Sequence, residues 1–128
     1  MKRLSHAAVA ATLVLVAAGG WPTPAPAQDA PPSHVADPGV YKVITENAQF
    51  RVVQAVWKPG QRDAPHSHPA TAVYYQTSCT LQSFGPDGSP RGGGPIGEGT
   101  VFVQDPTPAH AIQNTGAREC RVLIFERK

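Results

Sequence analysis

The sequence predicts an all-β fold of the sandwich, jelly-roll or small-barrel kind. Short segments rich in β-branched and aromatic residues follow one another from residue 41 to residue 127. Clusters of Pro, Gly, Asn and Asp, which form turns, separate these segments. No window shows a sustained helical period that begins at a cap and ends at a stop signal. Short strands at close spacing are typical of all-β architectures.

The strands are predicted, in chain order, at residues 41–45, 50–57, 72–78, 80–84, 100–104, 109–114 and 121–127. The glycine-rich connection at residues 89–99 lacks the Gly-Lys-Ser/Thr ending of a phosphate-binding loop. We therefore interpret it as a flexible hairpin loop with a brief edge strand at Pro95 and Ile96. The side chains predicted to line the barrel or the sheet core are Phe50, Val52, Val56, Phe102, Ile112 and Leu123.

The N-terminal residues 1–27 have the order of a secretory signal peptide. A short basic start is followed by an apolar run at residues 7–18, and Ala25-Pro26-Ala27 supplies small residues before a cleavage point. The apolar run is too short to span a bilayer as a stable helix, so we expect no stable membrane insertion after cleavage. We expect a mature protein that starts at Gln28 and is periplasmic or secreted.

The rest of the chain is predicted to hold one domain. Residues 28–39 are dominated by Pro, Ala and Asp, which predicts a flexible tail, and residues 40–128 suffice for a single core. The full chain has 11 basic and 9 acidic residues, and Lys2 and Arg3 of the signal peptide account for the excess. A neutral mature chain lacks the basic surface of a nucleic-acid-binding protein, so we expect no nucleic-acid partner.

Three histidines form a candidate metal site. In an extended strand side chains alternate between faces, so His66 and His68 project from the same side. Two imidazoles held in this way can grip a first-row transition metal if the fold brings a third ligand to them. His110 is the candidate for that third ligand.

The spacing around these histidines resembles the two motifs of the cupin superfamily, and the resemblance covers nearly the whole predicted domain. The first motif begins with a Gly, followed by five residues and His-x-His, as at Gly60 here. The second leads from a Gly to a His and, after three intervening residues, to an Asn. Gly99, His110 and Asn114 match that order.

The sequence also departs from the family pattern. The Glu of the first motif falls at Ala72 or Val73, neither of which binds a metal, and Cys79 stands at its closing Gly. In the second motif Asp105 replaces a Pro and Thr107 replaces a Gly. The resemblance therefore implies a site of three histidines without the usual carboxylate.

The resemblance implies a double-stranded β-helix whose barrel mouth holds a divalent transition metal on His66, His68 and His110. Some cupin-like oxygenases, such as cysteine dioxygenase and diketone-cleaving dioxygenases, work with three histidines and no Glu. If the protein is an enzyme, we expect a small-molecule dioxygenase-like reaction at iron, with zinc, manganese, nickel or copper as other candidate metals. The alternatives are a non-catalytic cupin that binds or senses a small ligand or metal, and a metal-dependent isomerase or sugar-modifying enzyme. The resemblance also implies a homodimer.

Three more residues are candidate partners of the site. If position 72 faces inward, as the family's Glu does, Tyr74 and Gln76 share that face. Tyr74 would then hydrogen-bond a bound water or substrate, or else be ordinary barrel core, and Gln76 would act as a weak ligand. Asn114 either lies near the site or caps the turn before Gly116.

Cys79 and Cys120 are the only cysteines of the chain. An even count in an exported protein permits one disulfide. The alternative is a free Cys79 near the site, as a thiol ligand or a redox group.

Overall fold

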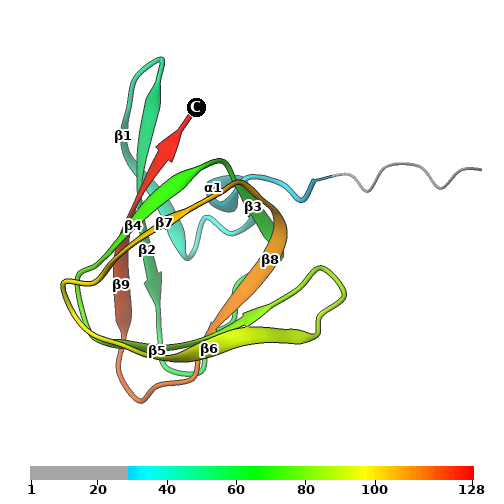
Figure 1. Ribbon diagram of the computed structural model, residues 1–128, viewed down its shortest axis with the longest axis vertical. Helices are drawn as coiled ribbons and strands as arrows, with labels where there is room; N and C mark the ends of the chain where they lie inside the picture. The colour runs from blue at the N-terminus through cyan, green and yellow to red at the C-terminus, as the bar shows by residue number, and fades with distance from the viewer. Residues whose placement is uncertain (1–28) are drawn as a thin grey trace, which may run out of the picture.

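The computed structural model describes residues 29–128 (Figure 1). The predicted signal peptide lies outside the described residues, and within them no helix is long and apolar enough to cross a membrane. The elements are α1 (Ser33–Ala36), β1 (Tyr41–Glu46), β2 (Phe50–Trp57), β3 (His66–His68), β4 (Thr71–Tyr75), β5 (Cys79–Phe84), β6 (Pro90–Ile96), β7 (Val101–Gln104), β8 (Thr107–Asn114) and β9 (Cys120–Arg127).

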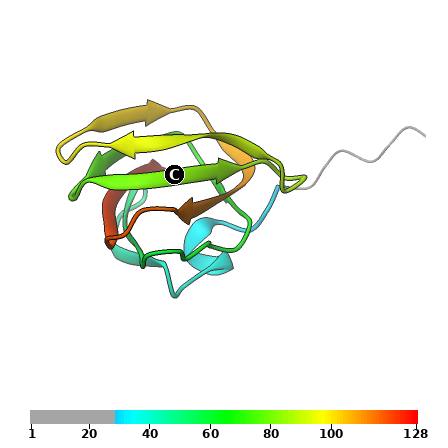
Figure 2. The same ribbon diagram turned by 90° about the horizontal axis from the view of Figure 1, so that it is seen from below.

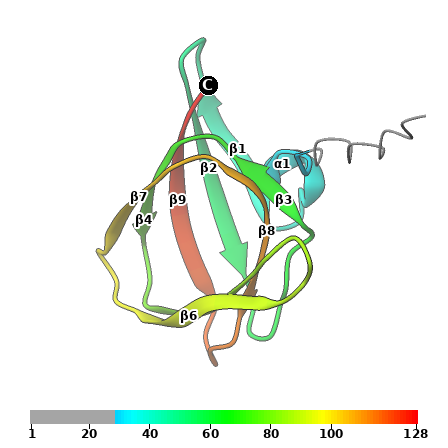
Figure 3. The same ribbon diagram turned by 45° about the vertical axis from the view of Figure 1, so that its right-hand side comes forward.

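The strands form two sheets that wind around a common interior (Figure 3). One sheet has five strands in the order β1-β2-β9-β4-β7, and the other has four in the order β3-β8-β5-β6. All pairings within them are antiparallel. The all-β prediction is therefore confirmed, and both sheets turn one face toward the shared core.

The interior face of β2 differs from the prediction by one residue. Val53, Ala55 and Trp57 are buried in the core, whereas Phe50 is 53% exposed. The reason is that β2 carries apolar residues on both faces, so alternation alone does not say which face is inward. Pairing with β9 decides it, because Val53 lies opposite the buried Ile124.

Of the other residues predicted to line the core, Val52, Val56 and Leu123 are only half-buried. Phe102 is exposed at the surface of β7, and Ile112 packs against the buried cluster as predicted.

The glycine-rich segment forms strand β6, where the sequence suggested a flexible loop. β6 pairs with β5 along its length, and Figure 2 shows this hairpin on one side of the molecule with α1 on the other. Backbone pairing needs no side chains, and at Gly93 it excludes one. A Cβ there would lie 2.5 Å from the Leu81 carbonyl oxygen.

Residues 29–39 pack against the barrel, unlike the flexible tail expected from their composition. The Ser67 amide donates to the Pro31 carbonyl at 2.9 Å, and the Ala30 amide donates to the Pro108 carbonyl at 2.9 Å. Ser33, in α1, is fully buried. The segment covers the region between β1 and β3, the adjoining edges of the two sheets (Figure 3). Backbone hydrogen bonds to β3 and β8 hold it, which composition does not reveal.

The structure joins Cys79 of β5 to Cys120 of β9 in a disulfide, with the two Cα atoms 5.1 Å apart. The bond links the two sheets across a sequence separation of 41 residues. It leaves no free thiol within the described residues for the alternative role of Cys79.

Replacing both cysteines with alanine is expected to lower the free energy of unfolding by about 2–4 kcal/mol, because the unfolded chain regains the freedom that the long loop loses when it is closed. Urea denaturation of the two oxidised proteins measures the difference. A reductant should destabilise the wild-type protein and leave the double variant unchanged. Equal stability of both proteins under both conditions would contradict the prediction.

Candidate metal centre

The structure brings His66, His68 and His110 together. His66 and His68 lie on β3, and His110 lies on β8 directly opposite His66 in the ladder. One candidate ligand nitrogen from each ring lies within 4.8 Å of the other two. The ring centroids of His66 and His110 are 4.5 Å apart. His66 is fully buried, and the other two rings are partly buried.

Hydrogen bonds to two of the rings leave the Nε2 lone pairs available. His66 Nδ1 lies 2.8 Å from the Ala64 carbonyl oxygen, and His68 Nδ1 lies 2.9 Å from Glu126 Oε1. Both oxygens are acceptors, so the proton of each ring lies on Nδ1 and the lone pair on Nε2. His110 Nε2 is buried and has no hydrogen-bond partner among residues 29–128. A buried, unpaired nitrogen is costly unless something binds it, so this donor set fits a metal ion.

Burial favours the neutral form of the His66 and His110 rings. It lowers the pKa of His110 to about 3, an effect to which the charges that His66 and His68 can carry also contribute. Burial lowers the pKa of His66 as well. Since only a neutral imidazole can ligate a metal, these two rings are ready to bind one at neutral pH.

The neutral His110 makes the metal-free protein sensitive to acid. Its pKa rises from about 3 in the folded state to about 6.5 on unfolding, so between these values the unfolded chain binds more protons. The stability that depends on this group is complete above about pH 6.5 and is lost as the pH falls toward 3, by up to about 1.4 kcal/mol per pH unit. Urea unfolding in the presence of a chelator, from pH 7 to pH 4, measures the slope. His110→Gln should show a shallower slope, and an equal slope in both proteins would contradict the assignment.

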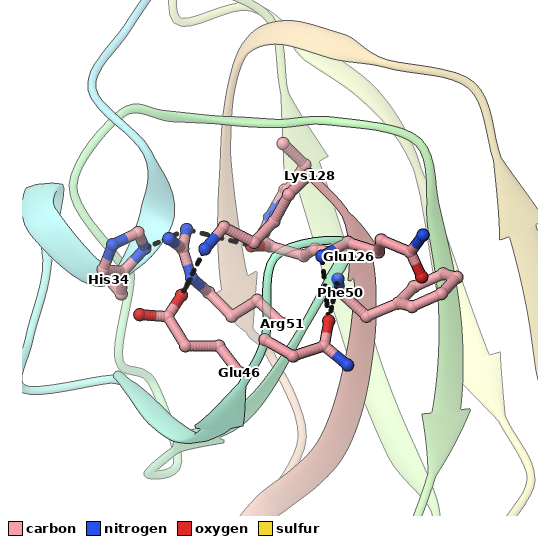
Figure 4. Close-up of polar contacts among 9 residues, drawn as sticks. His34, Glu46, Phe50, Arg51, Glu126 and Lys128 are labelled. Atoms are coloured by element: carbon pink, nitrogen blue, oxygen red, sulfur yellow. Dashed lines mark hydrogen bonds and ion pairs between the residues drawn. The ribbon is translucent and has the colours of Figure 1, made fainter.

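A buried carboxylate stands behind His68. Glu126 on β9 is only 1% exposed, and its Oε1 accepts the hydrogen bond from His68 Nδ1. Its other oxygen, Oε2, lies 3.5 Å from the Arg51 guanidinium. Figure 4 shows Arg51 among Glu46, His34 and Lys128, and Arg51 Nε donates to Glu46 Oε2 at 2.9 Å. A carboxylate behind a ligating imidazole fixes the ring and raises its basicity.

Sequence reasoning missed Glu126, although a signal was present. Val122, Ile124 and Glu126 share one buried face of the last strand, whereas Leu123 is half-buried and Phe125 is exposed. An acidic residue in phase with buried aliphatic ones is unusual, because carboxylates are seldom buried without a partner. That phase points to a carboxylate aimed into the interior.

A second buried carboxylate organises the surroundings of His66. Asp63 Oδ2 accepts from the Tyr41 hydroxyl at 2.6 Å and from Trp57 Nε1 at 2.9 Å. Its Oδ1 accepts from the backbone amide of Ile112 at 2.7 Å. This carboxylate thus joins β1, β2 and β8 at one point. It too was not singled out from the sequence, because it lies in a loop and its partners are distant along the chain.

The Tyr41 hydroxyl oxygen also lies 3.1 Å from His66 Nε2. Tyr41 has one hydroxyl proton, and it donates this proton in a hydrogen bond to the closer, charged Asp63. Burial, followed by the Asp63 carboxylate, holds the pKa of the Tyr41 hydroxyl well above its usual value, so this group stays a phenol. The lone pairs of the Tyr41 oxygen and of His66 Nε2 therefore face the same space. A cation bound there would satisfy both.

Tyr74 and Gln76 do not belong to the site, which corrects the sequence prediction. Tyr74 is 39% exposed, and Gln76 Oε1 accepts from the Gln54 side chain. Val73 pairs with the buried Ile124 and lines the interior next to His68 and His110, so β4 faces the core one residue out of phase with the expectation. Of the two candidate positions for the family's Glu, the inward one is thus Val73.

Asn114 has a structural role, which was the second of the two alternatives. The side chain is fully buried. Its Nδ2 donates to the carbonyl oxygens of Trp57 and Arg118, and its Oδ1 accepts from the Gly116 amide. These bonds cap the turn between β8 and β9.

A cavity of about 350 Å³ adjoins His110 between the two sheets. Tyr75 and Phe102 line it from the five-stranded sheet, and Leu81 and Ile112 line it from the four-stranded sheet. A smaller cavity of about 60 Å³ touches both His68 and His110. His110 thus borders both cavities, and His68 borders the smaller one.

No family model matches the sequence, and no curated protein matches it. Solved structures do. A cupin domain protein from Bordetella pertussis Tohama I is similar over 80% of this chain and 99% of its own, with a TM-score of 0.62 and 19% identity. An RmlC-like cupin family protein with a double-stranded β-helix fold, from Methanocaldococcus jannaschii, covers 69% of this chain and 78% of its own, with a TM-score of 0.55 and 12% identity. The polyketide cyclase RemF from Streptomyces resistomycificus covers 68% and 63%, with a TM-score of 0.51 and 16% identity. At these identities the similarity concerns the fold.

Proposed function

We propose that this chain, which has the cupin double-stranded β-helix fold, binds a divalent transition metal through His66, His68 and His110 and uses it on a small molecule. The observation that carries the proposal is the convergence of three imidazoles beside a cavity, with the buried His110 Nε2 left without a partner. The predicted cupin fold is confirmed. The binding of a metal and the reaction on a small molecule are what we propose.

The donor set suits several metals. Imidazole nitrogens bind zinc, iron, copper and nickel, and manganese more weakly. With Val73 at the inward position of the family's Glu, the ligands are all neutral, so a bound metal would keep its full positive charge at the cavity. We propose iron for an enzymatic role. A divalent iron held there would supply the redox chemistry that adds dioxygen to an organic substrate.

The residues of this chain prepare the site in two ways. Ala64 and Glu126 hold the Nδ1 protons of His66 and His68, so the Nε2 atoms point to a common space. The cavity wall next to His110 is largely apolar, which favours an organic ligand over bulk water. These features support a metal-dependent reaction on a small molecule.

Elemental analysis tests the metal site. The purified protein should hold close to one metal ion per chain after reconstitution with iron, zinc, copper, nickel or manganese in turn. His110→Ala and the double variant His66→Ala/His68→Ala should lose it. His34→Ala, a histidine outside the cluster, is the matched control and should bind like the wild-type protein. Much less than one ion per chain with every metal would contradict the proposal.

Oxygen uptake tests the dioxygenase-like reaction. The iron-loaded protein should consume dioxygen with pentane-2,4-dione, a small uncharged diketone, and His110→Ala should not. If the diketone supports no uptake but raises the melting temperature of the loaded protein, a binding role replaces the enzymatic one.

We also propose that the protein is exported. The disulfide between Cys79 and Cys120 supports this, because disulfides persist in oxidising compartments. N-terminal sequencing of the protein recovered outside the cytoplasm should start at Gln28. A chain that retains Met1 in the cytoplasm would contradict export.

A further inference from the structure

We infer that the cavity beside His110 binds one small, uncharged molecule built around a flat ring, and that Gly92 leaves the space for it. The inference rests on the proposed function and names the class of ligand that it would act on. The walls of the cavity, the glycines of β6 and the unpaired polar groups each support it.

The size and charge of the cavity restrict its ligand. At about 350 Å³ it lies near the lower end of the range for small-molecule sites, roughly 300–1,000 Å³, so it has room for a single compact molecule. The described residues that line it include no Asp, Glu, Lys or Arg. A charged group placed against this wall, away from the histidines, would lose its hydration without gaining an ionic partner, which disfavours it.

One wall of the cavity is aromatic. The rings of Tyr75 and Phe102 meet edge to face, with their centroids 5.8 Å apart. Phe102 is 42% exposed, although a phenylalanine is normally buried, so its ring has apolar surface left for a ligand. Aromatic rings prefer to stack or to meet edge to face with another ring, which favours a flat unsaturated ligand.

The facing wall comes from β6, which has three consecutive glycines at positions 92–94. The space around each of them differs. A Cβ on Gly93 would clash with the Leu81 carbonyl oxygen, and Gly94 has a φ of +141°, which other residues rarely adopt. Gly92 has neither constraint, and a Cβ there would meet nothing within 4 Å. Because side chains alternate along a strand, Gly92 lies on the same face as Ile96, which packs against the core. A side chain at position 92 would therefore occupy the cavity.

Two uncharged polar side chains can orient the ligand. Ser83 and Gln104 both line the cavity. Within the part of the chain that the structure describes, no side-chain hydrogen bond uses the Ser83 hydroxyl or the Gln104 amide. Both groups can donate and accept, so they suit a hydroxyl or carbonyl substituent on the ring.

Calorimetric titration of the metal-free protein, in the presence of a chelator, with phenol, benzoate and cyclohexanol tests the inference, because a bound zinc ion would give benzoate an ionic partner that the wall does not supply. Phenol is flat and uncharged, benzoate is flat and charged, and cyclohexanol is uncharged and puckered. Phenol should bind at least about tenfold more tightly than the other two. Zinc content is measured separately after the same protein has been reloaded with zinc, so failure to bind metal, which would count against the proposed function, is distinguished from failure to bind phenol.

Variants locate the binding. Gly92→Leu should weaken phenol binding by at least about tenfold through overpacking, with zinc content unchanged. Gly97→Leu is the matched control, because Gly97 lies outside this cavity and a Cβ there meets only Thr100, at 3.9 Å. Phe102→Ala, at a partly exposed position, should weaken phenol binding about three- to tenfold and serves if Gly92→Leu does not fold. Equal binding of phenol and benzoate, or phenol binding unaffected by both Gly92→Leu and Phe102→Ala, would overturn the inference.

Discussion

Replacing Glu126 with glutamine is expected to weaken zinc binding by about ten- to a hundredfold. The carboxylate is buried and accepts the Nδ1 proton of His68, so it both orients the ring and raises the electron density at Nε2. Glutamine has nearly the same shape, and its amide oxygen can still accept from His68 Nδ1, but without the negative charge it raises the electron density at Nε2 much less. Titration against a competing chelator measures the change in affinity.

Glu46 provides a matched control for this prediction. Both Glu46 and Glu126 pair with Arg51, but Glu46 lies at the surface and does not contact a histidine. Glu46→Gln should therefore leave zinc affinity unchanged while making the same chemical replacement next to the same arginine. If the two variants bind zinc equally, the role assigned to Glu126 is wrong.

Asp63→Asn is expected to lower the free energy of unfolding by roughly 3–5 kcal/mol, because three buried hydrogen bonds lose their charged acceptor and at least one donor loses its partner. The donors are the Tyr41 hydroxyl, Trp57 Nε1 and the Ile112 amide. Denaturant unfolding of the metal-free protein measures this loss. Asp105→Asn, at an exposed loop position, is the control and should change stability little.

The same substitution should also weaken zinc binding, for a separate reason. Without the charged Asp63 as hydrogen-bond acceptor, the Tyr41 hydroxyl can donate to His66 Nε2, 3.1 Å away, and compete with the metal for that lone pair. Adding Tyr41→Phe removes the competing donor. The double variant should regain zinc affinity without regaining stability. If Tyr41→Phe restores none of the affinity, Asp63 acts on the fold alone.

The all-β class and the three histidines could be predicted because both depend on composition and on spacing along the chain. Strand segments show in composition, and the alternation of side chains places His66 and His68 on one face whatever the rest of the chain does. The spacing of the two motifs then indicated His110 as their neighbour. None of these steps requires knowledge of which strands pair.

Which residues of each strand point into the interior could not be predicted in the same way. β2 and β4 carry apolar residues on both faces, so shifting the inward face by one residue leaves the pattern equally plausible. The errors at Phe50 and Tyr74 have this single cause. The pairing with β9, whose buried residues alternate clearly, settles both strands.

The sequence alone thus determined the strand class and the three candidate ligand histidines, because these depend on composition and on spacing along the chain. The tertiary structure was needed for the groups that prepare those histidines. Glu126 lies 58 residues from His68, and Tyr41 lies 22 residues from Asp63. Such contacts depend on sheet order and register, which are set by packing over the whole barrel. For the same reason, only the folded protein shows that Gly92 faces a cavity.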